Sequence, residues 1–157
     1  MTSPKPFKYN TIAVGGTFDV IHKGHEALLK RAFDTGERVV IGITSDRFAK
    51  DSGKAPLHDF PNRKKQMESY LSGQFPGRDY RITELDRTFG PGMFSNDIEA
   101  LAVSSETEAR VADANKRRGE LGLPDLKVEV VPLVLAKDGK KISTTRIREG
   151  EIDESGR

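Results

Sequence analysis

The turn from Gly15 to His25 holds the side chains of this chain that are best suited to chemistry on a phosphate. It combines glycines with the hydroxyl of Thr17 and the imidazoles of His22 and His25. Glycine allows a backbone to approach a ligand closely, and histidines three residues apart can face the same bound group. The residue types of this turn therefore predict a phosphate-binding site.

The segments on either side of the turn place it where such ligands bind. Residues 11–14 (TIAV) are apolar and β-prone, and residues 24–35 carry Leu28, Leu29 and Ala32 on one helical face. The turn therefore joins a strand to a helix. A helix N-terminus at the carboxyl end of a strand offers unpaired N–H groups and partial positive charge to an anion.

Other phosphate and metal motifs fit this turn poorly. It does not match G-x-G-x-x-G, and no G-K-[ST] triplet follows it. A zinc site is disfavoured because His58 is the one remaining histidine, the chain has no cysteine, and no third ligand lies at ordinary spacing. The alternative that stays open is that His22 and His25 only cap the helix and form local hydrogen bonds.

Strand and helix patterns alternate along the whole chain, which indicates an α/β fold with a parallel sheet. We expect a single-domain Rossmann-like (doubly wound) architecture: a five-stranded parallel sheet with helices on both faces. A length of 157 residues fits one domain, residues 1–157, with loose ends at 1–8 and 151–157. The expected strands are 11–14, 38–44, 80–85, 100–104 and 128–135, and the expected helices are 24–35, 62–71, 106–121 and a short 143–149.

If the sheet is parallel, the loops after its strands share one edge and their polar side chains can form a single site. Lys50 follows the second expected strand, and residues 86–92 form a glycine-rich loop after the third. Ser104 and Glu106 follow the fourth strand, and residues 143–145 follow the fifth. Cations and hydroxyls from several loops are thus expected beside the two histidines.

Two motifs resemble those of the HxGH nucleotidyltransferases, which transfer an NMP group from an NTP to a phosphate or carboxylate acceptor. Residues 16–19 (GTFD) and 22–25 (HKGH) are similar to the first signature of this superfamily. Residues 141–148 (KISTTRIR) resemble the I-S-[ST]-T-R-I segment near the C-terminus of these enzymes. The resemblance runs from about residue 9 to 152, and the two motifs occur in the expected order.

Within the superfamily, the chain is most similar to the archaeal-type phosphopantetheine adenylyltransferases, which make dephospho-coenzyme A from ATP and 4′-phosphopantetheine. One departure concerns Thr144 and Thr145, which are closer to the I-S-T-T of glycerol-phosphate cytidylyltransferases and archaeal FAD synthetases. The R-T-x-G that precedes I-S-T-T in the cytidylyltransferases is replaced here by residues 137–141 (KDGKK). A cytidylyltransferase or FAD synthetase is therefore the alternative, and a non-catalytic nucleotide- or CoA-binding module is a second alternative.

The resemblance implies a role for each candidate residue. His22 and His25 would donate to the triphosphate and its transition state, because a phosphate acceptor is already an anion and needs no strong general base. Thr17 and Lys50 would complete the catalytic set, and both would bind the acceptor together with Arg63. The residues expected to bind the nucleotide are Gly15, Gly16, Thr17, Phe18, His25, Ser104, Glu106, Ser143, Thr144 and Thr145. Mg²⁺ is implied by the triphosphate rather than by a protein ligand set, so no metal-binding residue is expected.

Composition bounds the partners of the chain. The net charge is only +2 and aromatic residues make up 7%, which argues against a nucleic-acid surface. No apolar run reaches the length of a membrane span and no secretory leader pattern opens the chain, so we expect a cytoplasmic protein without a membrane partner. The expected partners are ATP and 4′-phosphopantetheine as substrates, with dephospho-CoA and CoA as product-like ligands. Oligomeric state is left open.

Overall fold

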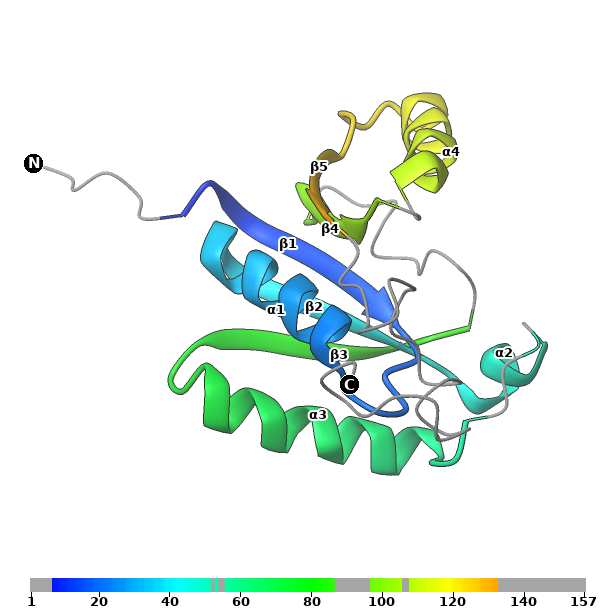
Figure 1. Ribbon diagram of the computed structural model, residues 1–157. Helices are drawn as coiled ribbons and strands as arrows, with labels where there is room; N and C mark the ends of the chain where they lie inside the picture. Colours follow the sequence, from blue (N-terminus) through cyan, green and yellow to red (C-terminus); the bar gives the residue numbers. More distant parts are fainter. Residues whose placement is uncertain (1–6, 52, 54–55, 87–96, 106–107, 133–157) are drawn as a thin grey trace, which may run out of the picture.

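An all-parallel sheet organises the chain in the computed structural model, which describes residues 7–51, 53, 56–86, 97–105 and 108–132 (Figure 1). The strands lie in the order β3-β2-β1-β4-β5, and every neighbouring pair is parallel. The strands are β1 (Tyr9–Gly16), β2 (Gly36–Thr44), β3 (Asp79–Leu85), β4 (Ala100–Ser104) and β5 (Lys127–Val131). The helices are α1 (Lys23–Thr35), α2 (Asp46–Asp51), α3 (Phe60–Gln74) and α4 (Glu108–Glu120). The predicted α/β class and five-stranded parallel sheet are confirmed.

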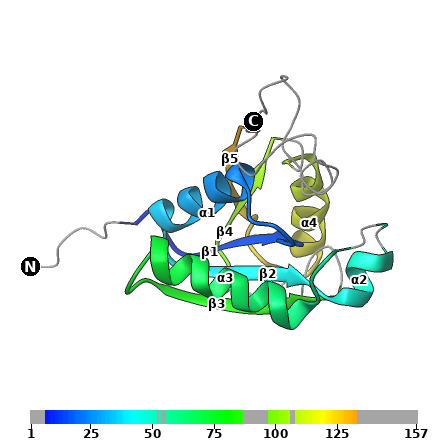
Figure 2. The ribbon, with the colours of Figure 1, turned by 60° about the horizontal axis from the view of Figure 1, so that its bottom comes forward.

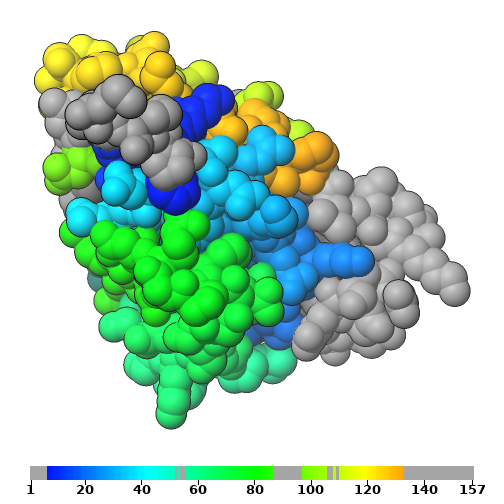
Figure 3. All heavy atoms as spheres, turned by 90° about the vertical axis from the view of Figure 1, so that its left-hand side faces the viewer, coloured from blue at the N-terminus to red at the C-terminus, as the bar shows by residue number. Residues whose placement is uncertain are grey.

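Helices cover both faces of the sheet, as a parallel sheet with apolar strands requires. On one face, Leu29 and Phe33 of α1 and Met67 of α3 belong to a single core cluster with the central strands. The two helices lie side by side over this face (Figure 3). On the other face lies α4 (Figure 2), whose Val111 and Ala114 belong to a second core cluster. The expectation of helices on both faces is therefore confirmed.

The strand order fixes where a ligand can enter. The chain runs outward from β1 through β2 to β3 and then returns to place β4 on the other side of β1. Ligands of open α/β sheets bind at such a reversal, outside the carboxyl ends of the strands. Because β1 ends at Gly16 and β4 ends at Ser104, the turn that carries the two histidines starts at this position.

The helix α2 corrects the expectation that Lys50 lies in a loop after the second strand, because residues 46–51 are helical. Ser45 caps the helix, since its Oγ accepts the Phe48 N–H at 3.0 Å and its carbonyl accepts the Ala49 N–H at 2.9 Å. A Ser at the N-cap is a recognised helix start, but a helix of six residues is too short to show an apolar periodicity.

Element ends also differ from the expected ones. The helix α3 begins at Phe60 rather than residue 62, because the Asp59 carboxylate caps it by accepting the Asn62 N–H at 3.0 Å. Strand β5 ends at Val131, before Pro132, which has no N–H for a ladder. The expected strand residues 133–135, the first two residues of the third expected helix and the expected helix 143–149 lie outside the described residues. In the part of the chain that is described, no helix combines the length and apolar character needed to cross a membrane.

Candidate active site

The two motif histidines build the first turn of α1. His22 is the N-cap, and its Nδ1 accepts the Gly24 N–H at 3.1 Å. The Nδ1 of His25 accepts the His22 N–H at 3.4 Å, which closes a reciprocal capping box made of imidazoles. A neutral imidazole whose Nδ1 accepts a hydrogen bond carries its proton on Nε2. Both rings therefore hold an Nε2–H donor at the positive end of a helix dipole.

Packing fixes the orientation of these rings. The His22 and His25 rings stack with centroids 3.8 Å apart and planes 17° apart, and Phe18 packs on His25 with centroids 4.7 Å apart. Gly24 is needed because a Cβ there would lie 2.9 Å from Cε1 of His22. Phe18 adopts a left-handed backbone with φ of 51°, and its ring is buried in the core. The structure thus brings the two histidines together and leaves Phe18 only its backbone to offer to a ligand.

Burial also sets the charge of His22. The side chain is mostly buried, and this desolvation lowers its pKa from 6.5 to about 4. The ring is therefore neutral at pH 7. It carries a single proton, on Nε2, and can donate it in a hydrogen bond. A neutral donor also avoids charge repulsion within the stacked pair.

We expect this burial to make folding stability depend on pH. The unfolded chain protonates His22 near pH 6.5 and the folded chain only near pH 4, so stability falls as the pH drops through that window. The loss should be about 1–2 kcal/mol, less than the full shift would give, because the ring keeps some solvent access. His22→Asn is the matched variant, since Asn also caps helices but does not titrate.

Urea denaturation at pH 7.5 and pH 5.0 measures this effect. The wild type should lose more stability between the two pH values than His22→Asn does, because all other titrating groups are common to both proteins. An identical loss in the two proteins would contradict the assignment of the pKa shift to His22.

The ends of β1 and β2 bring two threonine hydroxyls together. Gly15 pairs with Gly42 in the sheet, so the residues that follow the two strands leave it side by side. The Oγ1 atoms of Thr17 and Thr44 lie 3.2 Å apart. This contact confirms that the loops after the first two strands share one edge. Thr17 is a site residue expected from the sequence, whereas the sequence predicts no role for Thr44.

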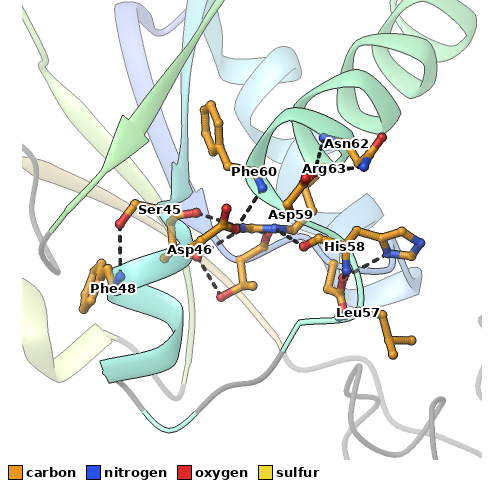
Figure 4. A network of polar contacts seen from close by, with 12 residues as sticks. Ser45, Asp46, Phe48, Leu57, His58, Asp59, Phe60, Asn62 and Arg63 are labelled. Atoms are coloured by element: carbon orange, nitrogen blue, oxygen red, sulfur yellow. Dashed lines mark hydrogen bonds and ion pairs between the residues drawn. The ribbon is translucent and has the colours of Figure 1, made fainter.

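Arg63 is buried completely between these loops. Its Nη1 donates to the carbonyl of Thr17 at 2.9 Å and to that of Thr44 at 2.8 Å, and its Nε donates to the carbonyl of His58 at 3.0 Å. Its Nη2 forms an ion pair with the Asp46 carboxylate at 2.8 Å. Figure 4 shows Arg63 between Asp46 and His58. The guanidinium ties the loop after β1, the start of α2 and the start of α3 to one another.

Asp19 holds the same region from the other side. Its carboxylate is buried and accepts the N–H groups of Leu57 and His58, each at 2.9 Å, and lies 3.0 Å from Nδ1 of His58. Burial alone would raise the pKa of Asp19, but these hydrogen bonds outweigh it and hold the pKa below its usual value. The carboxylate thus fastens the histidine turn to the segment that leads into α3.

The remaining candidates are spread along the same edge or lie outside the described residues. Lys50 is exposed in the last turn of α2, and no described contact joins it to the histidines. Ser104 ends β4 beside β1 and is half-buried. The candidates at positions 106 and 143–145 fall outside the described residues. Within the described ranges, no group of three His, Asp or Glu side chains could hold a metal ion.

Asp19 belongs to the first motif, but the sequence does not predict that four residues hold the site in place through contacts between loops: Asp19, Thr44, Asp46 and His58. Their functions depend on contacts between loops that are distant in the sequence, for which a single residue type gives no signal. One pattern could have suggested them, because an arginine in the first turn of a helix after an Asp cap is well placed to reach the preceding loops.

A histidine pair at a helix N-terminus, a neighbouring hydroxyl and a strand-reversal position are the features of a phosphate site. A family model described as Cytidylyltransferase-like matches residues 13–150. The chain therefore belongs to the class of cytidylyltransferase-like proteins, as its two motifs predict.

Similar proteins narrow the class further. The phosphopantetheine adenylyltransferase of Methanothermobacter thermautotrophicus is 43% identical over 149 residues, covering 95% of this chain and 89% of that protein. The phosphopantetheine adenylyltransferase of Methanopyrus kandleri is 37% identical over 147 residues, covering 94% and 93%. A protein with unknown function from Archaeoglobus fulgidus superposes with a TM-score of 0.67 at 28% identity, covering 77% of this chain and 88% of the other. The chain belongs to the phosphopantetheine adenylyltransferase family, which confirms the predicted resemblance.

Proposed function

We propose that this protein transfers AMP from ATP to 4′-phosphopantetheine, forming dephospho-CoA and pyrophosphate. The observation that carries the proposal is the imidazole capping box, which fixes two Nε2–H donors at the N-terminus of α1. Family membership over almost the whole chain supports the choice of substrates.

The transfer is an in-line displacement at the α-phosphorus. An oxygen of the acceptor phosphate forms the new P–O bond while the bond to the bridging oxygen of pyrophosphate breaks, so negative charge grows on the oxygens around phosphorus. Donors that are fixed in advance stabilise that charge without reorganising. His22 and His25 would supply such donors. No proton needs to leave the acceptor, since a phosphate monoester is already an anion at neutral pH.

The other residues would position the phosphates. Thr17 would orient the acceptor phosphate, and Lys50 would reach the reacting phosphates from α2. Arg63 is expected from the sequence to bind the acceptor, but its buried guanidinium and its bonds to the Thr17 and Thr44 carbonyls favour a positioning role instead. The backbone around Gly15 and Gly16, together with Ser104 and the residues at positions 106 and 143–145, would border the nucleotide.

Mg²⁺ would accompany ATP, bound through phosphate oxygens and water, and would neutralise charge on the triphosphate. The described residues fit this arrangement, because His22 and His25 supply donors and Lys50 supplies a cation for phosphate.

Pyrophosphate release tests the proposal. ATP and CTP are each assayed with 4′-phosphopantetheine, FMN, glycerol 3-phosphate and nicotinamide mononucleotide. We expect turnover with ATP and 4′-phosphopantetheine, and inhibition by added dephospho-CoA. Turnover only with CTP, or only with FMN, would overturn the assignment and would favour the alternatives that the I-S-T-T segment suggests.

A further inference from the structure

A chain of hydrogen bonds leads from the buried guanidinium of Arg63 to the hydroxyl of Thr17. Nη1 of Arg63 lies 3.3 Å from Oγ1 of Thr44, and Oγ1 of Thr44 lies 3.2 Å from Oγ1 of Thr17. The same Nη1 holds the carbonyls of both threonines, at 2.9 Å for Thr17 and 2.8 Å for Thr44. One guanidinium therefore fixes the backbone of both threonines and also contacts the hydroxyl of Thr44.

The direction of these hydrogen bonds follows from which groups can donate and which can accept. Arginine has only donors, so Oγ1 of Thr44 accepts from Arg63. The proton of the Thr44 hydroxyl then needs an acceptor, and in the described part of the chain Oγ1 of Thr17 is the acceptor within reach. The Thr17 oxygen accepts, and its own proton finds no partner among the described residues.

We propose that Thr44 is a positioning residue that makes the hydroxyl of Thr17 a donor to the acceptor phosphate. A hydroxyl can turn either its proton or a lone pair toward a ligand. With Thr44 donating to Thr17, the Thr17 proton is directed away from Thr44 and can be offered to a ligand. The charge of Arg63 strengthens both hydrogen bonds by polarising them. This inference rests on the proposed function, in which Thr17 meets the acceptor phosphate.

A double-mutant cycle tests the proposal. Thr44→Val and Thr17→Val each remove one hydroxyl and keep the branched shape that suits a strand end. We expect Thr44→Val to raise the KM for 4′-phosphopantetheine about fivefold to tenfold, because Thr17 loses its fixed direction, and to leave the KM for ATP within about twofold. Thr44→Ser should restore the wild-type KM, since it restores the hydroxyl.

The cycle separates action through Thr17 from a general disturbance. If Thr44 acts through Thr17, adding Thr44→Val to Thr17→Val should have no further effect on either KM. Thr35→Val is the matched control, because its Oγ1 donates to the Arg31 carbonyl at 2.6 Å within α1, away from the site. It should change neither KM. Urea denaturation of each variant checks that the comparison is made on folded protein.

Different results would contradict the positioning role of Thr44 and the proposed function. Two results with an active wild type would overturn the positioning role of Thr44 and leave the proposed function standing. One is additive effects of the two Val substitutions. The other is a rise in the KM for ATP as large as the rise in the KM for 4′-phosphopantetheine. Turnover only with another phosphate monoester would overturn the proposed acceptor. The same double-mutant cycle with that monoester would then test whether Thr44 positions Thr17. A wild type that releases no pyrophosphate with any acceptor would overturn both.

Discussion

His25→Ala is expected to lower kcat about 10²–10³-fold, the usual cost of removing one fixed donor to transition-state charge. The Nε2–H of His25 is fixed because its Nδ1 accepts the His22 N–H and because its ring is held between His22 and Phe18. A donor that meets charge only as it develops affects kcat more than substrate affinity. The dissociation constant of ATP should therefore change by no more than about threefold.

Single-turnover kinetics and calorimetric ATP binding check this expectation. Lys30→Ala is the matched control on the exposed side of the same helix, where Lys30 pairs with Asp34, and it should leave kcat unchanged. A loss of ATP affinity as large as the loss of kcat would show that His25 anchors the ground state. His25→Gln, which retains an N–H donor, should recover part of kcat.

The sequence predicts the fold well where a local pattern is strong. Strand β2 carries a continuous apolar run, Val39 to Ile43, which is expected of a parallel strand covered on both faces. The helix α2 is missed because its main signal is a cap at Ser45 followed by too few residues to show a period. Strand β5 ends at Val131, although the apolar pattern predicts a strand through Pro132, which cannot donate to the ladder.

The site is predictable from the sequence only in its first layer. His22 and His25 lie three residues apart in one motif, so their proximity follows from helix geometry. The contact of Thr17 with Thr44 depends on the register that pairs Gly15 with Gly42, and a single sequence carries no signal for that register. The same limit explains why the sequence predicts that Arg63 binds the acceptor. In the structure its guanidinium is buried beneath the loops that would contact the acceptor.

Arg63→Met is expected to lower the free energy of unfolding by about 3–5 kcal/mol, the range found when one partner of a buried polar network is removed. The partly buried carbonyls of Thr17, Thr44 and His58 would all lose the donor that Arg63 supplies. Arg63→Lys should rescue little, because one ammonium group cannot reproduce the planar fork. Asp46→Asn should cost about 1 kcal/mol or less, since the Asp46 side chain is 55% exposed and Asn keeps an oxygen acceptor.

Urea denaturation measures this asymmetry, and the kinetics of the same variants show whether Arg63 also positions the site. Arg78→Met is the matched control, because Nη2 of Arg78 likewise donates to two carbonyls, those of Phe33 and Gly36 at 2.8 and 2.9 Å, but at the opposite end of α1. At a temperature where both variants are folded, Arg78→Met should keep the wild-type KM for the acceptor and Arg63→Met should raise it. If Arg63→Met and Arg78→Met lose the same stability and both keep wild-type kinetics, Arg63 has a structural role only. A higher acceptor KM in Arg63→Met alone would show that the buried guanidinium determines where the phosphate groups meet.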